Sequence, residues 1–184
     1  REDGKEWFKI DPDSAESKFF KFRKNEFSYD DLDQPIPYKL RVEQEDAVNK
    51  TIEYFKNHNN PEFLWNAKPR FGKTLASYDL CMKMGFEKIL IVTNRPAIAD
   101  SWYDDYIKFI GPKSGYFFVS RVSGIKNEKY AFSRDEYMDL LNPDTSKGCI
   151  EFVSLQDLKG SIHFGGDKPK LDEVANTNWD ILII

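Results

Sequence analysis

The segment FLWNAKPRFGKT, residues 63–74, constrains the fold of this chain more than any other stretch. Its apolar start at 63–65 predicts a strand, and a helical pattern follows Thr74 directly. Between them lies the spacing of a phosphate-binding loop, G-x-x-x-x-G-K-[ST], with Ala67 at the position of the first glycine. This order of strand, loop and helix predicts that backbone amides and the positive end of a helix dipole surround a phosphate.

The residue types in the loop suit a nucleoside triphosphate that is bound together with Mg²⁺. Gly72 lets the backbone approach a phosphate closely. Lys73 places a charge on the β and γ phosphates, and the Thr74 hydroxyl is a ligand for Mg²⁺. The predicted nucleotide-binding residues of the loop are Ala67, Lys68, Pro69, Arg70, Phe71, Gly72, Lys73 and Thr74. Lys73 and Thr74 are the predicted catalytic groups, whereas Arg70 has a structural or solvated role as its alternative. The alternative for the whole loop, a surface turn with a helix cap, does not explain why an apolar strand runs into it.

Composition limits the class of protein. The 184 residues are 40% hydrophobic and 32% charged, which is ordinary for a soluble α/β domain. The net charge of −4 excludes a generally basic surface, so any contact with nucleic acid must come from a local patch. No apolar run is long enough to span a bilayer and no signal peptide is visible, so we expect a cytoplasmic protein.

The order of elements predicts the fold. Residues 1–36 are polar with scattered aromatic side chains, and we interpret them as a lead-in or the edge of a preceding domain. In residues 37–184, helices and strands alternate, which predicts a three-layer α/β fold with a parallel sheet and helices on both faces. The predicted helices are 44–57, 74–84, one from Pro96 to Ile110 with an apolar face that includes Trp102, 134–141 and 171–176. The predicted strands after the loop are 88–93, 116–120, 149–154 and 180–184. Because the chain starts without Met and stops in an apolar strand, we expect it to be cut from a longer protein.

Several segments together resemble the first RecA-like lobe of superfamily 2 (DEAD/DEAH-type) helicases and translocases. The segments are LRVEQEDAV (40–48), NAKPRFGKT (66–74), IVTNRPAIADSW (91–102), FVSLQDL (152–158) and WDILII (179–184). The chain looks most like the motor subunits of type I and type III restriction enzymes. The resemblance covers about residues 38–184, and its most specific part is the phosphate-binding loop.

The resemblance implies roles for residues outside the loop. Arg41 and Gln44 match an upstream motif in which Gln hydrogen-bonds the adenine edge. Two segments match regions that contact the nucleic-acid backbone, and their predicted contact residues are Thr93, Asn94, Arg95, Ser154 and Gln156. Four of these residues also have an ordinary alternative: an exposed helix start for Gln44, a surface salt bridge for Arg95, and a turn with a helix cap for Ser154 and Gln156.

The resemblance further implies the ATP-binding lobe of a DNA helicase or translocase, part of a restriction-modification or related defence enzyme. Its partner is DNA, in duplex form and bound through the backbone. The acidic Asp-Glu box that follows the strand at 180–184 in the family, and the second RecA-like lobe, are not among these residues. We therefore expect this chain to bind ATP weakly without turning it over. The alternatives are a P-loop NTPase or kinase that does not translocate, and a module whose loop is vestigial.

Overall fold

The computed structural model describes residues 35–122, 125, 128, 130–140 and 147–184, and residues 35–184 form one compact unit. The predicted lead-in, residues 1–36, lies outside the described residues except for Pro35 and Ile36. The described part starts with an extended segment that is held at several points. Ile36 N donates to Lys108 O at 2.8 Å, and the Tyr38 hydroxyl donates to Asp79 Oδ1 at 3.0 Å.

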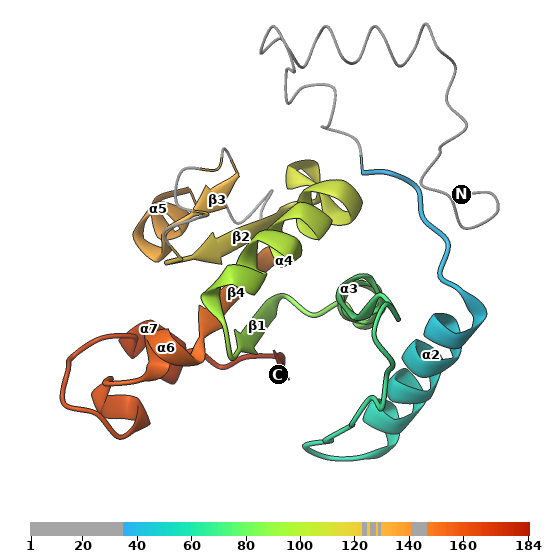
Figure 1. Cartoon of the computed structure of the whole chain (residues 1–184), viewed down its shortest axis with the longest axis horizontal. Helices are drawn as coiled ribbons and strands as arrows, with labels where there is room; N and C mark the ends of the chain where they lie inside the picture. The colour runs from blue at the N-terminus through green and yellow to red at the C-terminus, as the bar shows by residue number, and fades with distance from the viewer. Residues whose placement is uncertain (1–34, 123–124, 126–127, 129, 141–146) are drawn as a thin grey trace, which may run out of the picture. The chain divides into compact units, whose positions relative to one another are not determined.

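Five parallel strands form one sheet in the order β3-β2-β4-β1-β5 (Figure 1). The strands are β1 (Lys88–Thr93), β2 (Tyr116–Ser120), β3 (Ala131–Phe132), β4 (Gly148–Ser154) and β5 (Ile181–Ile183). Every residue of the central strand β4 is buried, as expected for a parallel sheet that is covered on both faces. The parallel α/β fold predicted from the sequence is confirmed.

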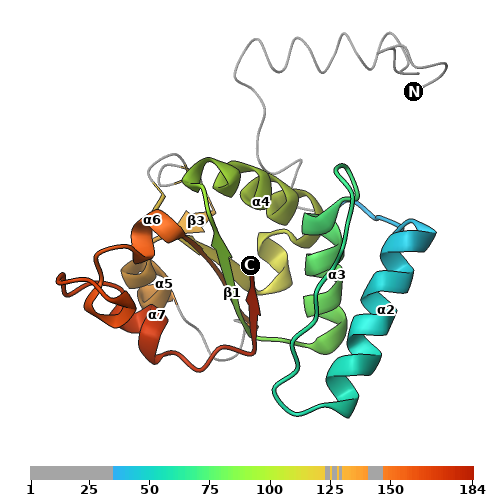
Figure 2. The same ribbon diagram turned by 60° about the horizontal axis from the view of Figure 1, so that its bottom comes forward.

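Helices cover both faces of the sheet (Figure 2). One face is covered by α3 (Lys73–Met84), α4 (Ala99–Asp105) and the π-helical turn η3 (Tyr106–Ile110), and the other by α5 (Arg134–Leu140), α6 (Leu155–Leu158) and α7 (Asp172–Asn176). Helix α2 (Val42–Asn57) packs on α3 through a cluster of Val48, Ala76 and Leu80, which also includes Leu40 just before α2. Single helical turns lie at η2 (Pro96–Ile98), η4 (Pro112–Ser114) and η5 (Ile162–Phe164).

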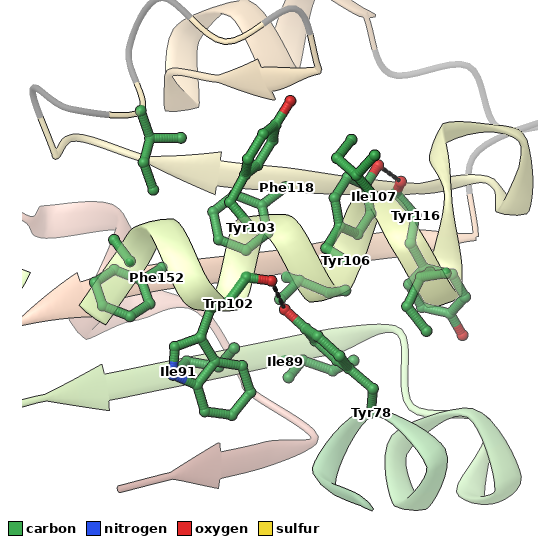
Figure 3. Close-up of a cluster of buried hydrophobic side chains, with 14 of the residues drawn as sticks. Tyr78, Ile89, Ile91, Trp102, Tyr103, Tyr106, Ile107, Tyr116, Phe118 and Phe152 are labelled. Atoms are coloured by element: carbon green, nitrogen blue, oxygen red, sulfur yellow. Dashed lines mark hydrogen bonds between the residues drawn. The ribbon is translucent and has the colours of Figure 1, made fainter. Parts of the chain in front are cut away.

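The main core lies between the sheet and the helices α3 and α4 (Figure 3). It is rich in aromatic side chains whose polar atoms have partners. The Tyr78 hydroxyl donates to Trp102 O at 2.8 Å, and the Tyr106 hydroxyl donates to Tyr116 O at 2.8 Å. Trp102 is therefore a core residue, as its helical spacing predicted, and these bonds let large tyrosines be buried without unpaired hydroxyls.

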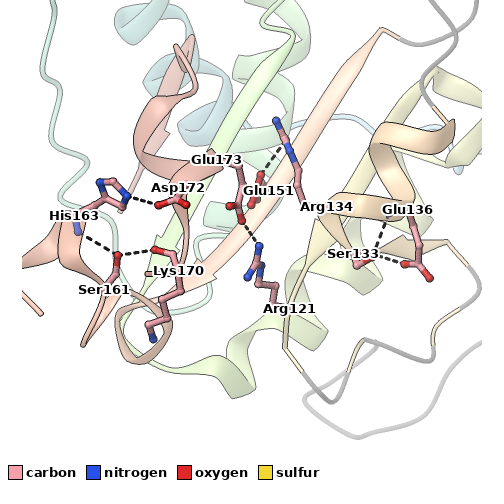
Figure 4. A network of polar contacts seen from close by, with 10 residues as sticks. All are labelled: Arg121, Ser133, Arg134, Glu136, Glu151, Ser161, His163, Lys170, Asp172 and Glu173. Carbon is pink, nitrogen blue, oxygen red and sulfur yellow. Dashed lines mark hydrogen bonds and ion pairs between the residues drawn. The ribbon is translucent and has the colours of Figure 1, made fainter. Parts of the chain in front are cut away.

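The opposite face of the sheet carries a polar network (Figure 4). Arg134 of α5 lies 3.2 Å from Glu151 in the middle of β4, and Arg121 after β2 pairs with Glu173 of α7. Burial raises the pKa of Glu151 to about 7, because loss of water outweighs the attraction of Arg134, and Glu173 raises it further. These ion pairs connect α5 and α7 to the sheet.

Most predicted elements are confirmed, and the differences are local. Strands 88–93 and 116–120 have the predicted bounds, and α3 ends at Gly85 in the left-handed conformation. The predicted strand at 63–65 is wrong: residues 61–68 have no regular secondary structure and join no sheet in the described part of the chain. The sequence reading also missed β3 and α6, which are only two and four residues long.

Candidate nucleotide-binding site

The loop 66–72 and the start of α3 lie at the end of the sheet where β1 finishes (Figure 2). In parallel α/β sheets this carboxyl end is where ligands bind. The loop is accessible, since Gly72 and Lys73 are exposed and Thr74 is half-buried. The structure therefore places the predicted phosphate-binding residues where the fold has its usual ligand site.

The loop has a defined backbone shape. Residues 68–71 form a turn in which Phe71 N donates to Lys68 O at 3.2 Å, and Arg70 (φ 64°) and Gly72 (φ 81°) are both left-handed. A left-handed residue followed by a helical one turns successive N–H groups toward one concavity, a geometry that binds anions. Gly72 followed by Lys73 has this geometry, so the amides from Gly72 onward are the ones suited to phosphate.

Three other loop residues have no amide available for a phosphate. The Ala67 amide donates to Trp65 O at 3.0 Å, the Phe71 amide closes the turn, and Pro69 has no N–H. These three residues can shape the loop but offer no free amide to a phosphate. Ala67, at the position of the first glycine in the motif, is accommodated without a positive φ.

The amino end of α3 has no internal compensation for its positive dipole. Gly72 is the N-cap, no side chain caps the helix, and its first turn has no acidic residue. The first amides of a helix have no partner within it, and an anion is stabilised there. Lys73 also lines a groove of about 280 Å³ whose other wall includes the carboxyl end of β5. These amide donors and the Lys73 ammonium are chemically suited to a phosphate group.

Gln44 and Arg41 hold the loop from the side of α2. Gln44 is 4% exposed, accepts from Arg41 N at 2.8 Å, and donates to Phe71 O at 2.7 Å. Arg41 Nη2 donates to Arg70 O at 3.0 Å and also to Phe71 O. In this arrangement both residues contact the loop backbone, which is a role that the resemblance to an adenine-binding motif did not indicate.

Gly72 is favoured by its φ of 81° and by the close approach of the Gln44 side chain. A Cβ at this position would lie 2.5 Å from Gln44 Nε2. Any side chain would therefore have to displace the amide that holds the loop, in a conformation that L residues rarely adopt.

The two predicted nucleic-acid segments are neighbours at the same end of the sheet. Thr93 at the end of β1 is paired in register with Ser154 at the end of β4. Asn94, Arg95 and Gln156 are exposed there. Ser154 has no exposed surface, donates to Asp157 Oδ2 at 2.6 Å and caps α6, so its hydroxyl orders the turn.

The contact between Thr51 of α2 and Trp65, just before the loop, was not predicted from the sequence. Trp65 Nε1 donates to Thr51 Oγ1 at 2.7 Å, and the Trp65 ring lies edge-on to that of Phe71. The available signal was the spacing of Gln44, Val48 and Thr51, which places them on one face of α2. All three are buried.

Within residues 35–122, 125, 128, 130–140 and 147–184, no group of three or more His, Cys, Asp and Glu side chains could hold a metal ion. In the same part of the chain, no helix has the length and apolar composition needed to cross a bilayer.

The known proteins to which this chain is similar are described as restriction enzymes. Residues 37–184 match the family described as "Type III restriction enzyme, res subunit". The chain is 28% identical over 155 residues to the Mycoplasma pneumoniae protein named "Putative type II restriction enzyme and methyltransferase RM.MpnORF110P C-terminus". That match covers 79% of this chain but only 19% of the relative, so the chain spans about a fifth of its length. No solved structure matches the chain.

Proposed function

The chain belongs to the family of type III restriction enzyme res subunits, and from this premise we propose that residues 37–184 form the ATP-binding lobe of a DNA helicase or translocase in a restriction system. The observation that carries the proposal is the uncapped amino end of α3 behind the left-handed Gly72, at the carboxyl end of a parallel sheet. This arrangement supports phosphate binding on physical grounds that are independent of the family.

Each side chain at this end has a proposed task. The Lys73 ammonium binds the β and γ phosphates, and the Thr74 hydroxyl is a ligand for the Mg²⁺ that accompanies ATP. The metal ion neutralises charge on the phosphates when it is bound. Arg41 and Gln44 keep the loop carbonyls turned toward α2 through the hydrogen bonds described above, so the opposite side of the loop is left to its amides.

Contact with DNA is proposed for the neighbouring ends of β1 and β4. Arg95, Asn94 and Gln156 are exposed there, and together they offer one charge and two amides to a phosphate backbone. Such contacts position a motor on DNA without selecting a base sequence. A restriction motor that moves along DNA requires this kind of binding.

The test is Mg²⁺-dependent ATP binding to the 184-residue chain by isothermal titration calorimetry. Lys73→Ala should weaken binding about 10- to 100-fold, because it removes a charged contact to phosphate. Lys56→Ala, in the last turn of α2, is the matched control and should bind as the unchanged chain does. If the unchanged chain binds no ATP in the presence of Mg²⁺, the loop is vestigial and the proposal is wrong.

A second measurement separates a motor from a kinase. In a longer protein that includes this lobe, duplex DNA should stimulate ATP hydrolysis, whereas a kinase would transfer phosphate to a small acceptor without DNA. The chain itself should show no steady-state hydrolysis above that of Lys73→Ala. Turnover clearly above this control would contradict the expectation that the lobe binds without hydrolysing.

A further inference from the structure

The segment that leads into the phosphate-binding loop lacks the support that a strand would give it. Residues 61–68 form no ladder with the sheet in the described part of the chain. Leu64 is 90% exposed, whereas Trp65 beside it is half-buried. Some other contact must therefore fix where the loop begins.

That contact is the hydrogen bond from Trp65 Nε1 to Thr51 Oγ1, which is 2.7 Å long. Thr51 is 2% exposed, and its hydroxyl also donates to Ala47 O at 2.8 Å. Because the hydroxyl is fixed as a donor to α2, its lone pairs are directed to the indole. A buried bond of this kind holds its two partners in one orientation.

Trp65 in turn contacts the loop itself. Its ring centroid lies 6.3 Å from that of Phe71, with the rings inclined by 61°, and both side chains pack on the α2–α3 cluster. Phe71 lies between the two left-handed residues of the loop, Arg70 and Gly72. A left-handed conformation at a residue other than glycine costs roughly 1–2 kcal/mol and persists only where the surroundings impose it.

One face of α2 supplies all of these supports. Arg41, Gln44, Val48 and Thr51 follow one another at spacings of three, four and three residues, which places them along a single stripe of the helix. Arg41 and Gln44 hold the carbonyls at the end of the loop, and Thr51 holds its beginning through Trp65.

We propose that Thr51 and Trp65 are positioning residues of the nucleotide site, and that the hydrogen bond between them holds Phe71, and with it the loop, in the shape that binds phosphate. The inference rests on the proposed function, since it concerns the same loop. It adds two residues that the phosphate-binding motif does not contain.

The experiment measures Mg²⁺-ATP affinity by calorimetry in five variants of the 184-residue chain, together with the melting temperature without nucleotide. Thr51→Val removes the hydroxyl at constant shape, and Trp65→Phe removes the indole N–H. Each should weaken binding about three- to tenfold, the effect of one lost hydrogen bond. Thr51→Ser keeps the hydroxyl and should restore affinity to within twofold of the unchanged chain.

Trp179→Phe is the matched control. Trp179 is also half-buried, and its Nε1 donates to Val174 O at 2.9 Å, away from the loop. It should lower the melting temperature without changing affinity. The double variant Thr51→Val with Trp65→Phe should bind about as weakly as either single variant, because both remove the same bond.

Three outcomes would overturn the inference. The first is that Thr51→Val binds Mg²⁺-ATP as tightly as the unchanged chain. The second is that Thr51→Val and Thr51→Ser bind equally, and both more weakly than the unchanged chain. The third is that affinity follows melting temperature across all variants, including Trp179→Phe. These differ from failure of the proposed function, in which the unchanged chain itself binds no Mg²⁺-ATP.

Discussion

At the scale of single residues, Glu151 shows how burial and charge compete in this protein. It is 2% exposed in the fully buried strand β4, and its partner Arg134 is held over the ring of Tyr137. Burial is the main reason why the pKa of Glu151 rises to about 7, and the ion pair offsets only part of that cost. Between about pH 4.5 and pH 7, the Glu151 carboxyl therefore keeps its proton in the folded protein. The same carboxyl has a pKa of 4.5 in the unfolded chain and loses its proton in this range.

The consequence is a loss of stability as pH rises. The contribution of Glu151 is fully present below about pH 4.5 and is lost as pH approaches and passes about 7. Over this window the free energy of unfolding should fall by roughly 3 kcal/mol, at about 1.4 kcal/mol per pKa unit. Glu151→Gln should remove most of this slope in urea unfolding measured from pH 5 to 8, whereas Glu43→Gln, an exposed residue of α2, should keep it. An unchanged slope in Glu151→Gln would contradict the assignment.

At the scale of elements, the helices and strands that could be predicted are those with a clear hydrophobic pattern between turn residues. The runs KILIVT and YFFVS lie between turn residues and became β1 and β2, and the helix after Gly-Lys-Thr ended at Gly85 as predicted. Residues 63–65 have the same local pattern as a strand, but a strand needs a neighbour, and pairing is a tertiary property that no local pattern contains. The loop was predictable from its spacing. Its hydrogen bond to α2 through Trp65 was not, because the partner Thr51 lies far from the motif in the sequence.

Strand β5 leads to a prediction about association. Among the residues that the structure describes, β5 pairs only with β1. Ile181 and Ile183 pack on the core, whereas Leu182 between them is 52% exposed. An exposed apolar edge strand is a template for pairing with another chain. Leu182→Lys should reduce concentration-dependent self-association in sedimentation experiments without unfolding the protein. Ile181→Lys should instead lower the melting temperature, and equal self-association with and without Leu182→Lys would show that this edge is not used.

At the scale of the whole molecule, charge limits how the protein can bind DNA. The net charge of −4 gives no general attraction to DNA, so the proposed contact depends on the few groups at the carboxyl end of the sheet. Arg95 follows β1 at that end, whereas Lys88 begins the same strand at the opposite end. The two residues are a natural pair for testing which end faces DNA.

Arg95→Ala should weaken duplex DNA binding and reduce the slope of log affinity against log salt by about 1, the value for one phosphate contact. Lys88→Ala should leave both unchanged. The measurement is fluorescence anisotropy of a labelled duplex at several salt concentrations. If Lys88→Ala causes the larger loss, DNA binds at the other end of the sheet and the proposed interface is wrong.

The bonded segment at the start of the described chain gives the phosphate-binding loop a second connection to the molecule. Ile36 is joined to the π-helical turn, Tyr38 to α3, and Arg41 to the loop itself. The backbone from Pro35 to Arg41 thus connects the π-helical turn, α3 and the loop without passing through the sheet. A mechanical pull at residue 35 would be transmitted to the loop through these few residues.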